Sequence, residues 1–258
     1  MIQTLNKHVK WRKDKEDILI CDCKRLIDLK LPLKYKFFME KLEKGVEKGN
    51  LIEEEKKVLS DFEKMKLLSQ LEIKHIKSKE FNEAIKILDT ELGKKRVRSK
   101  DYLSKKLKKF PEFFIGVFLD KDLIGVVGGF PREDYLLMSE LAIDSKFQKR
   151  GFGKRLVEKF EQVAKEKYNQ INVGAEDKAI NFYSAVGYKP FLLIQFKPKD
   201  YSYNDFNNFN IIKKYDFGGY LTIEAKIIRY NMKLLNKLRK KYPSAYFQYI
   251  FTKNFKRI

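Results

Sequence analysis

The strongest constraint on the fold of this chain is an alternation of strand and helix patterns between residues 136 and 196. A strand-like run at 136–144 ends shortly before two closely spaced glycines, Gly151 and Gly153. Apolar residues then recur every three or four positions, which is the period of a helix packed on a sheet. A strand, a helix and a further strand follow, at 171–175, 179–186 and 188–196. The succession predicts an α/β (α+β) fold with a glycine turn at the start of its central helix.

The segments on either side extend this pattern. Residues 70–76 are typical of a strand and residues 80–92 of a helix, and two apolar runs around Lys121 predict a hairpin. Beyond residue 196 the order is strand, helix, strand, in YLTIEAKII, NMKLLNKLRKKY and YFQYIFTKN. This C-terminal extension would complete the sheet, wall an acceptor pocket or form a homodimer, and the sequence leaves these alternatives open.

Residues 1–70 differ in character, because three short strand-like pieces lead into two helices. The second helix is predicted to begin at Asn50, whose side chain would cap the free amides while Glu53 reaches back in a capping box. We interpret the chain as three domains: a winged-helix-like domain at 1–70, a core at 71–196, and an extension at 197–258 packed on the core. The first domain loosely resembles small peptide-recognition elements, and a structural or oligomerisation role is an equal alternative.

The composition and net charge indicate which classes of partner the chain could bind. The chain of 258 residues carries a formal net charge of +21, which is typical of proteins that bind polyanions. Lysine is abundant along the whole chain, however, together with Ile, Asn, Tyr and Phe, so charge alone establishes no nucleic-acid ligand. Three glutamates at 53–55 would also repel DNA at the first turn of the second N-terminal helix. Nucleic acid is therefore a partner that we consider and do not favour.

Location and metal content follow from what the sequence lacks. No apolar run approaches the roughly 18 residues of a membrane span, and no apolar segment follows the cationic start as in a secretory signal. We expect a cytoplasmic protein with no membrane partner. Cys21 and Cys23, with His8 and His75 elsewhere, lack the ligand spacing of a zinc site, so we expect free thiols and no metal.

The glycine turn is the strongest candidate for a binding site. The first turn of a helix leaves backbone N–H groups unpaired at the positive end of the helix dipole, and such a turn attracts phosphate. Cations surround it at Lys149, Arg150, Lys154 and Arg155. The turn lacks the third glycine of a dinucleotide fingerprint, and the chain contains no P-loop for nucleotides. Taken alone, the turn is also compatible with an ordinary strand-to-helix connection that has a solvated basic rim.

Two sequence motifs taken together favour a binding site over an ordinary strand-to-helix connection. SELAIDSKFQKRGFGKRLVEKF, followed by AINFYSAVGYKPF, resembles the acetyl-coenzyme A binding core of the GNAT N-acetyltransferases, over about residues 71–196. The family pattern Q/R-x-x-G-x-G/A matches residues 148–153, and F-Y-x-x-x-G-F/Y matches residues 182–188. The resemblance implies a GNAT-type mixed sheet in which the strand at 137–143 splays from the strand at 171–175.

The resemblance also implies a cosubstrate and its binding residues. Acetyl-coenzyme A would lie with its pantetheine arm along the main chain of Leu141, Ala142 and Ile143. Its diphosphate would meet the main-chain amides of the turn, at Gln148, Lys149, Arg150, Gly151, Phe152, Gly153 and Lys154. The implied activity is an acetyl-CoA-dependent N-acetyltransferase whose acceptor is an amine of a small molecule, peptide or protein. Whether acetyl or a longer acyl group is transferred stays open.

Two residues are expected to carry the proton transfers. In the family the tyrosine at the position of Tyr183 faces the sulfur, so Tyr183 is the candidate acid for the leaving thiolate; its alternative is a core tyrosine. Some family members carry a carboxylate where this chain has Asn172, so the base is not carried over. Glu140 is the best remaining carboxylate, with Glu176 behind it, and either is also readable as a solvated strand-end charge. The alternative function is an acyl-CoA-sensing regulatory protein that binds nucleic acid through residues 1–70.

Overall fold

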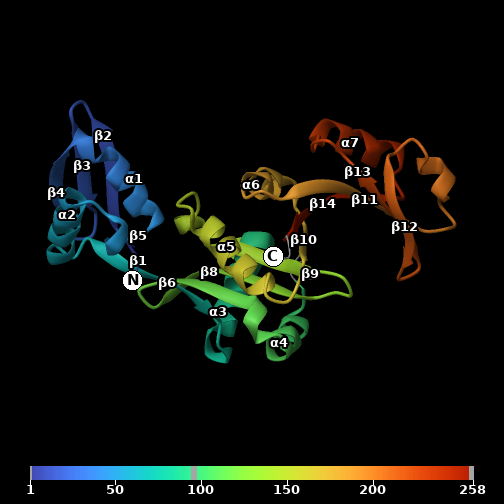
Figure 1. Ribbon diagram of the computed structural model, residues 1–258, viewed down its shortest axis with the longest axis horizontal. Coiled ribbons are helices and arrows are strands. Elements are labelled where there is room, and N and C mark those ends of the chain that lie inside the picture. Colours follow the sequence, from blue (N-terminus) through green and yellow to red (C-terminus); the bar gives the residue numbers. More distant parts are fainter. Residues whose placement is uncertain (1, 94–97, 256–258) are drawn as a thin grey trace. The chain divides into compact units, whose positions relative to one another are not determined.

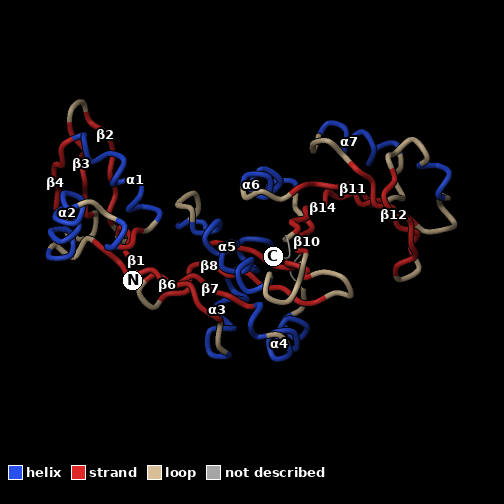
Figure 2. The backbone as a smooth tube through the Cα atoms, in the orientation of Figure 1, coloured by secondary structure: helices blue, strands red, loops and turns tan. Residues whose placement is uncertain are grey.

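The computed structural model describes residues 2–93 and 98–255 and contains two compact units. Unit 1 comprises Met1–Gly128 and Glu140–Phe160, and unit 2 comprises Gly129–Ser139 and Glu161–Ile258. Both combine strands with helices in a mixed α/β architecture, as the sequence predicts (Figures 1 and 2). Strands β8 (Asp122–Pro131) and β9 (Leu136–Ile143) and helix α5 (Phe152–Ala164) each contribute residues to both units.

The N-terminal part of unit 1 has its own small sheet and core. Strands β2 (Val9–Asp14), β3 (Asp17–Asp22) and β4 (Ile27–Pro32) pair antiparallel, and helices α1 (Lys36–Lys44) and α2 (Glu53–Lys64) follow. Figure 1 shows both helices beside this sheet. Their apolar faces meet it in a buried cluster that includes Ile18, Ile20, Phe38, Leu42 and Leu59. The elements agree with the sequence, and the winged-helix likeness stays a prediction.

The predicted cap of α2 is wrong. Asn50 lies in a short 3₁₀ turn, Lys48–Asn50, and the helix begins three residues later. Ile52 is the residue before the first helical position, and its backbone N–H donates to Glu55 Oε2 at 3.4 Å. The reaching-back acid is therefore Glu55 rather than Glu53. Because three glutamates follow one another at 53–55, the sequence pattern of a capping box fits more than one starting residue. Lys41 pairs with Glu55 at 3.0 Å, and this ion pair favours Glu55 as the capping acid.

The remaining strands of unit 1 pair in the order β5-β1-β6-β7-β8-β9. They are β5 (Val46–Glu47), β1 (Ile2–Leu5), β6 (Leu68–His75) and β7 (Phe114–Leu119), with β8 and β9. β5 to β8 pair antiparallel, and every residue of β7 is buried. On β8, a Cβ at Gly125 would lie 2.3 Å from Ile143 Cδ1 and 3.0 Å from the Ala142 carbonyl oxygen. Glycine thus allows the close approach of β8 to the end of β9.

Helices α3 (Phe81–Leu88) and α4 (Lys100–Lys109) pack against β7, β8 and β9 in an apolar cluster. The helix predicted at 80–92 is shorter than expected, because the chain continues into a π-helical turn, Asp89–Gly93, and Gly93 adopts a φ of +83°. Helix α4 was not predicted from the sequence. Its buried residues, Leu103 and Leu107, are separated by lysines that conceal the apolar stripe.

Unit 2 contains a sheet in the order β12-β13-β11-β14-β10-β9. Its elements are β10 (Gln170–Gly174), α6 (Ile180–Ala185), β11 (Lys189–Phe196), β12 (Ile211–Phe217), β13 (Tyr220–Lys226), α7 (Met232–Lys241) and β14 (Tyr246–Asn254). β14 lies between β10 and β11 and pairs antiparallel with both. The C-terminal segment therefore completes the sheet, which was one of the three alternatives.

The parallel pairing between β9 and β10 in unit 2 is short. β9 and β10 run parallel and pair at two positions, Ile171 with Leu136 and Asn172 with Leu137. The next residues of β10, Val173 and Gly174, pair with β14 and, within the described residues, not with β9. The parallel pairing is thus limited to two residues of each strand, and the splay of the two strands stays a prediction.

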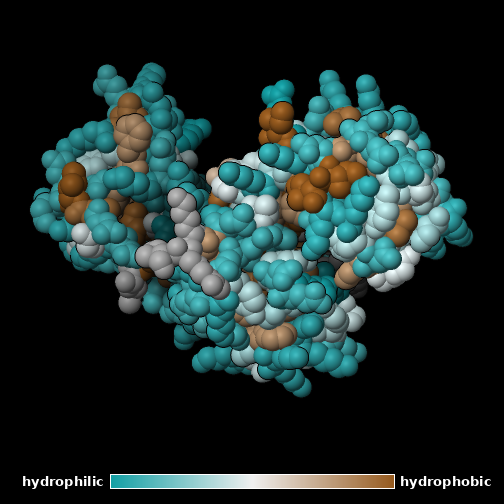
Figure 3. All heavy atoms as spheres, turned by 45° about the vertical axis from the view of Figure 1, so that its right-hand side comes forward, coloured by the Kyte–Doolittle hydropathy of each residue, from teal (hydrophilic) through white to brown (hydrophobic). Residues whose placement is uncertain are grey.

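The surface agrees with the lysine-rich composition. Figure 3 shows a mostly hydrophilic face with separate hydrophobic patches, and the exposed apolar side chains include Phe37, Ile52 and Ile228. Across residues 2–93 and 98–255, helices long and apolar enough for a membrane crossing are absent. Both cysteine thiols are free, with Sγ atoms 3.9 Å apart, and a hydrogen bond with Asp28 together with burial raises the pKa of Cys21 to about 12.

Candidate functional site

The turn between β9 and α5 is held in shape by its own polar groups. Asp144 accepts a hydrogen bond from the Lys146 amide at 3.0 Å, and the side chain of Gln148 donates to the Ile143 carbonyl oxygen at 2.8 Å. The side chain of Phe147 is buried and anchors the turn to the protein core. The backbone after Ile143 therefore leaves the sheet along a fixed path before α5 begins at Phe152.

Two residues of this turn adopt the left-handed conformation. Lys149 has a φ of 64° and Gly151 a φ of +81°, while Arg150 between them does not have a positive φ. Successive N–H groups in turns that contain left-handed residues can form an anion-binding nest. The glycine at 151 allows this conformation without steric cost, whereas the lysine at 149 adopts it as a non-glycine residue.

The amides of the turn have no acceptor among the described residues. The first hydrogen bond of α5 runs from the Arg155 amide to the Gly151 carbonyl oxygen at 3.2 Å. Within the described residues, the backbone N–H groups of positions 149 to 154 donate to no protein acceptor. These are the orphan donors expected before and within the first turn of a helix, where the helix dipole adds positive potential.

Side-chain cations add to this potential. Lys149 and Lys154 are exposed, and Lys154 is 3.8 Å from Glu158 on the next turn of the helix. The Arg150 guanidinium lies over the ring of Phe147, 5.8 Å from its centroid. The turn thus combines fixed main-chain donors with exposed positive charge, which is the chemistry of a phosphate or diphosphate site.

Glu91 braces the turn from the segment after α3. Its carboxylate accepts from the Ser145 amide at 2.9 Å and from the Gln148 side chain at 3.0 Å. The side chain of Gln148, a predicted binding residue, is therefore engaged within the protein. Glu91 was not predicted as a site residue, because it lies 57 residues from Gln148 and no motif joins them.

The residues predicted to hold the pantetheine arm occupy the last positions of β9. Ala142 and Ile143 are buried and Leu141 is half-buried. Ala142 belongs to the apolar cluster under α3 and α4. The structure brings these three residues together with the turn in unit 1, because the turn follows directly from the strand.

Glu140 is buried rather than solvated, which corrects the alternative interpretation of a strand-end charge. Its residue is 4% exposed, and it lines a small enclosed hollow whose other walls are apolar, including Phe81, Leu103 and Phe114. Arg98 Nη1 donates to Glu140 Oε1 at 2.9 Å. Burial raises the pKa of Glu140 above its usual range, and the Arg98 guanidinium opposes that rise. Arg98, 42 residues away in sequence, is a second residue that sequence analysis missed.

Tyr183 lies in unit 2, on the short helix α6. The side chain is buried at 6% exposure and its ring contacts three others, those of Phe182, Tyr188 and Phe251, with centroids 5.3 to 6.0 Å apart. Gly187, with a φ of +88°, ends the helix in the left-handed conformation that the sequence predicts.

The end of α6 is fixed by a third residue that sequence analysis missed. Lys253 Nζ donates to the Val186 carbonyl oxygen at 3.1 Å and pairs with Glu161 at 2.8 Å. The same ammonium lies 5.4 Å from the centroid of the Tyr188 ring. These contacts hold the segment that follows Tyr183.

Unlike Glu140, the other two positions considered for the base, Asn172 and Glu176, lie in unit 2. Asn172 is buried, and its side-chain oxygen accepts from Gln170 at 2.8 Å. Glu176 is half-buried, and one of its oxygens lies 3.7 Å from Lys178. Both already have protein partners in this structure.

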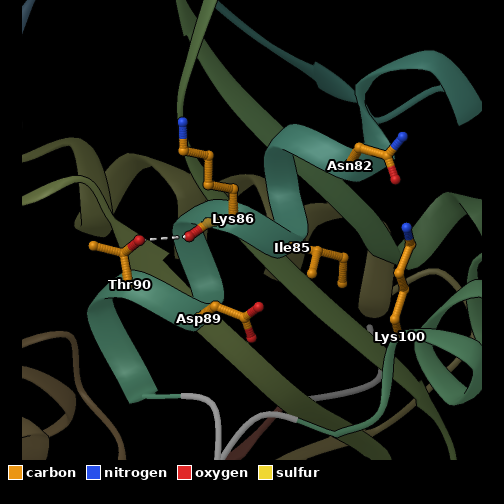
Figure 4. A pocket seen from close by; sticks show the side chains of 6 residues that line it. All are labelled: Asn82, Ile85, Lys86, Asp89, Thr90 and Lys100. Atoms are coloured by element: carbon orange, nitrogen blue, oxygen red, sulfur yellow. Dashed lines mark hydrogen bonds between the residues drawn. The ribbon is translucent and has the colours of Figure 1, made fainter.

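An open hollow between α3 and the start of α4 is a separate feature of unit 1. Figure 4 shows its lining, which consists of Asn82, Ile85, Lys86, Asp89, Thr90 and Lys100. Charges of both signs occur, and none of the predicted site residues takes part. In the described residues, clusters of histidine, cysteine, aspartate or glutamate suited to a metal ion are absent. We therefore place the candidate site at the β9–α5 turn and not at this hollow.

Comparison with protein families gives one match. Residues 73–188 match the Acetyltransferase (GNAT) family. The matched segment contains the turn, Glu140 and Tyr183, while the N-terminal sheet β2–β4 and strands β11 to β14 lie outside it. No curated protein matches the sequence.

Several solved structures match part of this chain. A protein from Pyrococcus horikoshii assigned as an acetyltransferase is 13% identical, with 57% of this chain and 50% of that chain covered and a TM-score of 0.43. Ard1 from Thermoplasma volcanium is 16% identical, with coverage of 62% and 99% and a TM-score of 0.44. N-acetylglutamate synthase from Neisseria gonorrhoeae, complexed with coenzyme A and N-acetyl-glutamate, is 13% identical, with coverage of 73% and 36% and a TM-score of 0.46. The match thus spans about half of the first of these chains and about a third of the last.

Proposed function

We propose, because residues 73–188 match the acetyltransferase (GNAT) family, that this chain transfers an acetyl group from acetyl-CoA to an amine. The observation that carries the proposal is the β9–α5 turn, where the amides of positions 149 to 154 have no protein acceptor in the described residues. Such a cradle fits the diphosphate of a coenzyme A molecule, since main-chain donors and nearby cations both favour it. Acetyl-CoA supplies the activated acetyl thioester when bound.

The turn holds and orients the cosubstrate in this proposal. The amides of Lys149, Arg150 and Gly151 donate to the diphosphate, and the first turn of α5 adds its N–H groups and dipole. Glu91 and Gln148 act indirectly, because their hydrogen bonds fix the turn. The main chain of residues 141–143 pairs with the pantetheine arm as an additional strand would.

Tyr183 is the proposed acid of the reaction. Its hydroxyl group can donate a proton, so it is suited to protonate the sulfur that leaves the acetyl group. The ring contacts with Tyr188 and Phe251 restrict the orientation of the side chain. A buried, oriented phenol costs little reorganisation during the reaction.

Glu140 is the proposed base. An amine in water has a pKa of about 8 for a chain terminus to about 10 for a lysine, and it is mostly protonated at pH 7. A proton must therefore leave before the nitrogen attacks the thioester. The carboxylate of Glu140 takes this proton, directly or through water. Its raised pKa brings it nearer to the working pH, which is the range in which a general base is most effective.

Thermal denaturation with acetyl-CoA tests the proposal. A ligand that binds the folded chain stabilises it by about 2.7 kcal/mol at 100 times its dissociation constant, so we expect the melting temperature to rise by several degrees. We also expect free thiol to be released when acetyl-CoA is incubated with a panel of small amines and peptides. An unchanged melting temperature at millimolar acetyl-CoA, together with no thiol release from any acceptor, contradicts the proposed function.

A further inference from the structure

The C-terminal end of α1, which lies outside the family match, reaches the β9–α5 turn. The position that a Cβ would take at Gly151 is 3.5 Å from Lys44 Cγ and 3.8 Å from Lys44 Cβ. One turn further along α5, the Arg155 guanidinium donates to the Gly45 carbonyl oxygen. Two separate contacts therefore join the end of α1 to the turn within unit 1.

The local structure fixes the position of Lys44. Gly45 ends α1 with a φ of +92°, and its amide donates to the Leu42 carbonyl oxygen at 3.1 Å. A side chain at position 45 would also collide with Ile2, since a Cβ would lie 2.9 Å from Ile2 Cγ2. The helix therefore stops here, with Lys44 as its last residue and Leu42 in the core beneath it.

The charge of Lys44 has no protein partner in the described residues. Lys44 is exposed, and no carboxylate of the described residues lies within salt-bridge distance of its ammonium. Other lysines of the same region are paired: Lys36 with Glu40 at 3.5 Å and Lys41 with Glu55 at 3.0 Å. The stem of Lys44 lies against Gly151, whose neighbours have unpaired amides. Beyond Cγ the side chain has two further methylenes, which carry a flexible ammonium next to the turn.

We propose that Lys44 is a binding residue for the diphosphate of coenzyme A, supplied by the N-terminal segment of the chain. This inference rests on the proposed function, because it needs coenzyme A at the β9–α5 turn. The ammonium of Lys44 then complements the main-chain donors of positions 149 to 154 with a point charge, as a lysine does in other phosphate sites. The N-terminal segment is in this respect part of the cosubstrate site.

Calorimetric titration with coenzyme A tests this role. Lys44→Ala is expected to weaken binding about tenfold, in line with the loss of one charge-assisted contact. Lys44→Arg retains the cation and is expected to bind within about threefold of the wild type. Lys36→Ala, which removes the same charge at the far end of α1, is the matched control and is expected to bind like the wild type. Melting temperatures without ligand verify that all three variants are folded.

A second titration identifies the phosphate. Dephospho-coenzyme A retains the diphosphate and lacks the 3′-phosphate, so Lys44→Ala is expected to weaken its binding by the same factor. Equal binding of dephospho-coenzyme A by the wild type and by Lys44→Ala overturns the assignment to the diphosphate. Unchanged affinity of Lys44→Ala for coenzyme A, when the wild type binds, overturns the role of Lys44 alone. Absence of binding by the wild type overturns the proposed function as well.

Discussion

Tyr183→Phe is expected to lower the turnover number about 100-fold and to leave the dissociation constant of coenzyme A within about twofold of the wild type. The change removes one hydroxyl and keeps the ring that contacts Phe182, Tyr188 and Phe251. A proton donor acts on the leaving thiolate only as the bond breaks, so its loss affects the chemical step and not the ground-state complex. Steady-state kinetics and equilibrium binding on the same preparation measure both quantities.

Tyr188→Phe is the matched control for this variant. Tyr188 is also buried, its ring contacts that of Tyr183, and its hydroxyl has no hydrogen-bond partner in the described part of the chain. Burial raises the pKa of this phenol, and the nearby charge of Glu161 adds to the effect. We expect near-normal turnover from Tyr188→Phe. Equal losses in the two variants, or parallel losses of turnover and coenzyme A affinity in Tyr183→Phe, would indicate that Tyr183 serves packing alone.

Glu140→Gln is expected to lower turnover by about 100-fold at neutral pH, which is the lower range for loss of a general base. If Glu140 is the base, the rate of the wild type is expected to rise with pH as the carboxyl loses its proton, and burial, which raises the pKa, is expected to place this rise above the usual range of a glutamate. Arg98→Met removes the guanidinium that opposes the effect of burial. The acidic limb of its rate profile is therefore expected at higher pH than in the wild type.

The same pKa shift has a consequence for stability. Because the pKa of Glu140 is higher in the folded chain, its contribution to stability is fully present below the pKa of the unfolded glutamate, about 4.3. That contribution is lost as pH rises through the folded pKa. The pH dependence of the free energy of unfolding, compared between wild type and Glu140→Gln, reports the shift without a need for activity.

The variant Glu176→Gln distinguishes which of the two carboxylates, Glu140 or Glu176, acts as the base. Glu176 is half-buried with one oxygen 3.7 Å from Lys178, and we expect its variant to retain most of the turnover and the wild-type acidic limb. A large loss in Glu176→Gln beside near-normal turnover in Glu140→Gln would transfer the role of base to Glu176. If the acidic limb of the rate profile lies at the same pH in Arg98→Met as in the wild type, that limb does not reflect the titration of Glu140.

Elements with a clear apolar period were predictable from the sequence, and lysine-rich elements were not. Helix α5 begins at Phe152 as its apolar spacing indicates, and Gly151 and Gly187 both adopt the left-handed conformation that their positions require. Helix α4 has two buried leucines among many lysines, so its amphipathic signal is weak. β12 was missed for a similar reason, since its paired residues IIKKYDF are mostly exposed and do not alternate.

The candidate site likewise contains residues that were predictable from the sequence and residues that were not. Residues of the turn are contiguous in sequence, so their motif specifies both position and main-chain chemistry. The residues that brace it come from distant segments: Glu91 reaches Gln148 across 57 positions, and Arg98 reaches Glu140 across 42. Local sequence patterns cannot indicate such contacts, because the partners meet only after the sheet and its covering helices have packed. The burial of Glu140 likewise depends on α3 and α4 and not on its own neighbours in β9.

A crystal structure of the complex with coenzyme A is the most direct test of the central claim, that the main-chain amides of the β9–α5 turn hold a diphosphate. The account predicts diphosphate oxygens within about 3.2 Å of several backbone nitrogens among positions 149 to 154. A complex in which the diphosphate binds elsewhere, while those amides remain without a ligand, would contradict it.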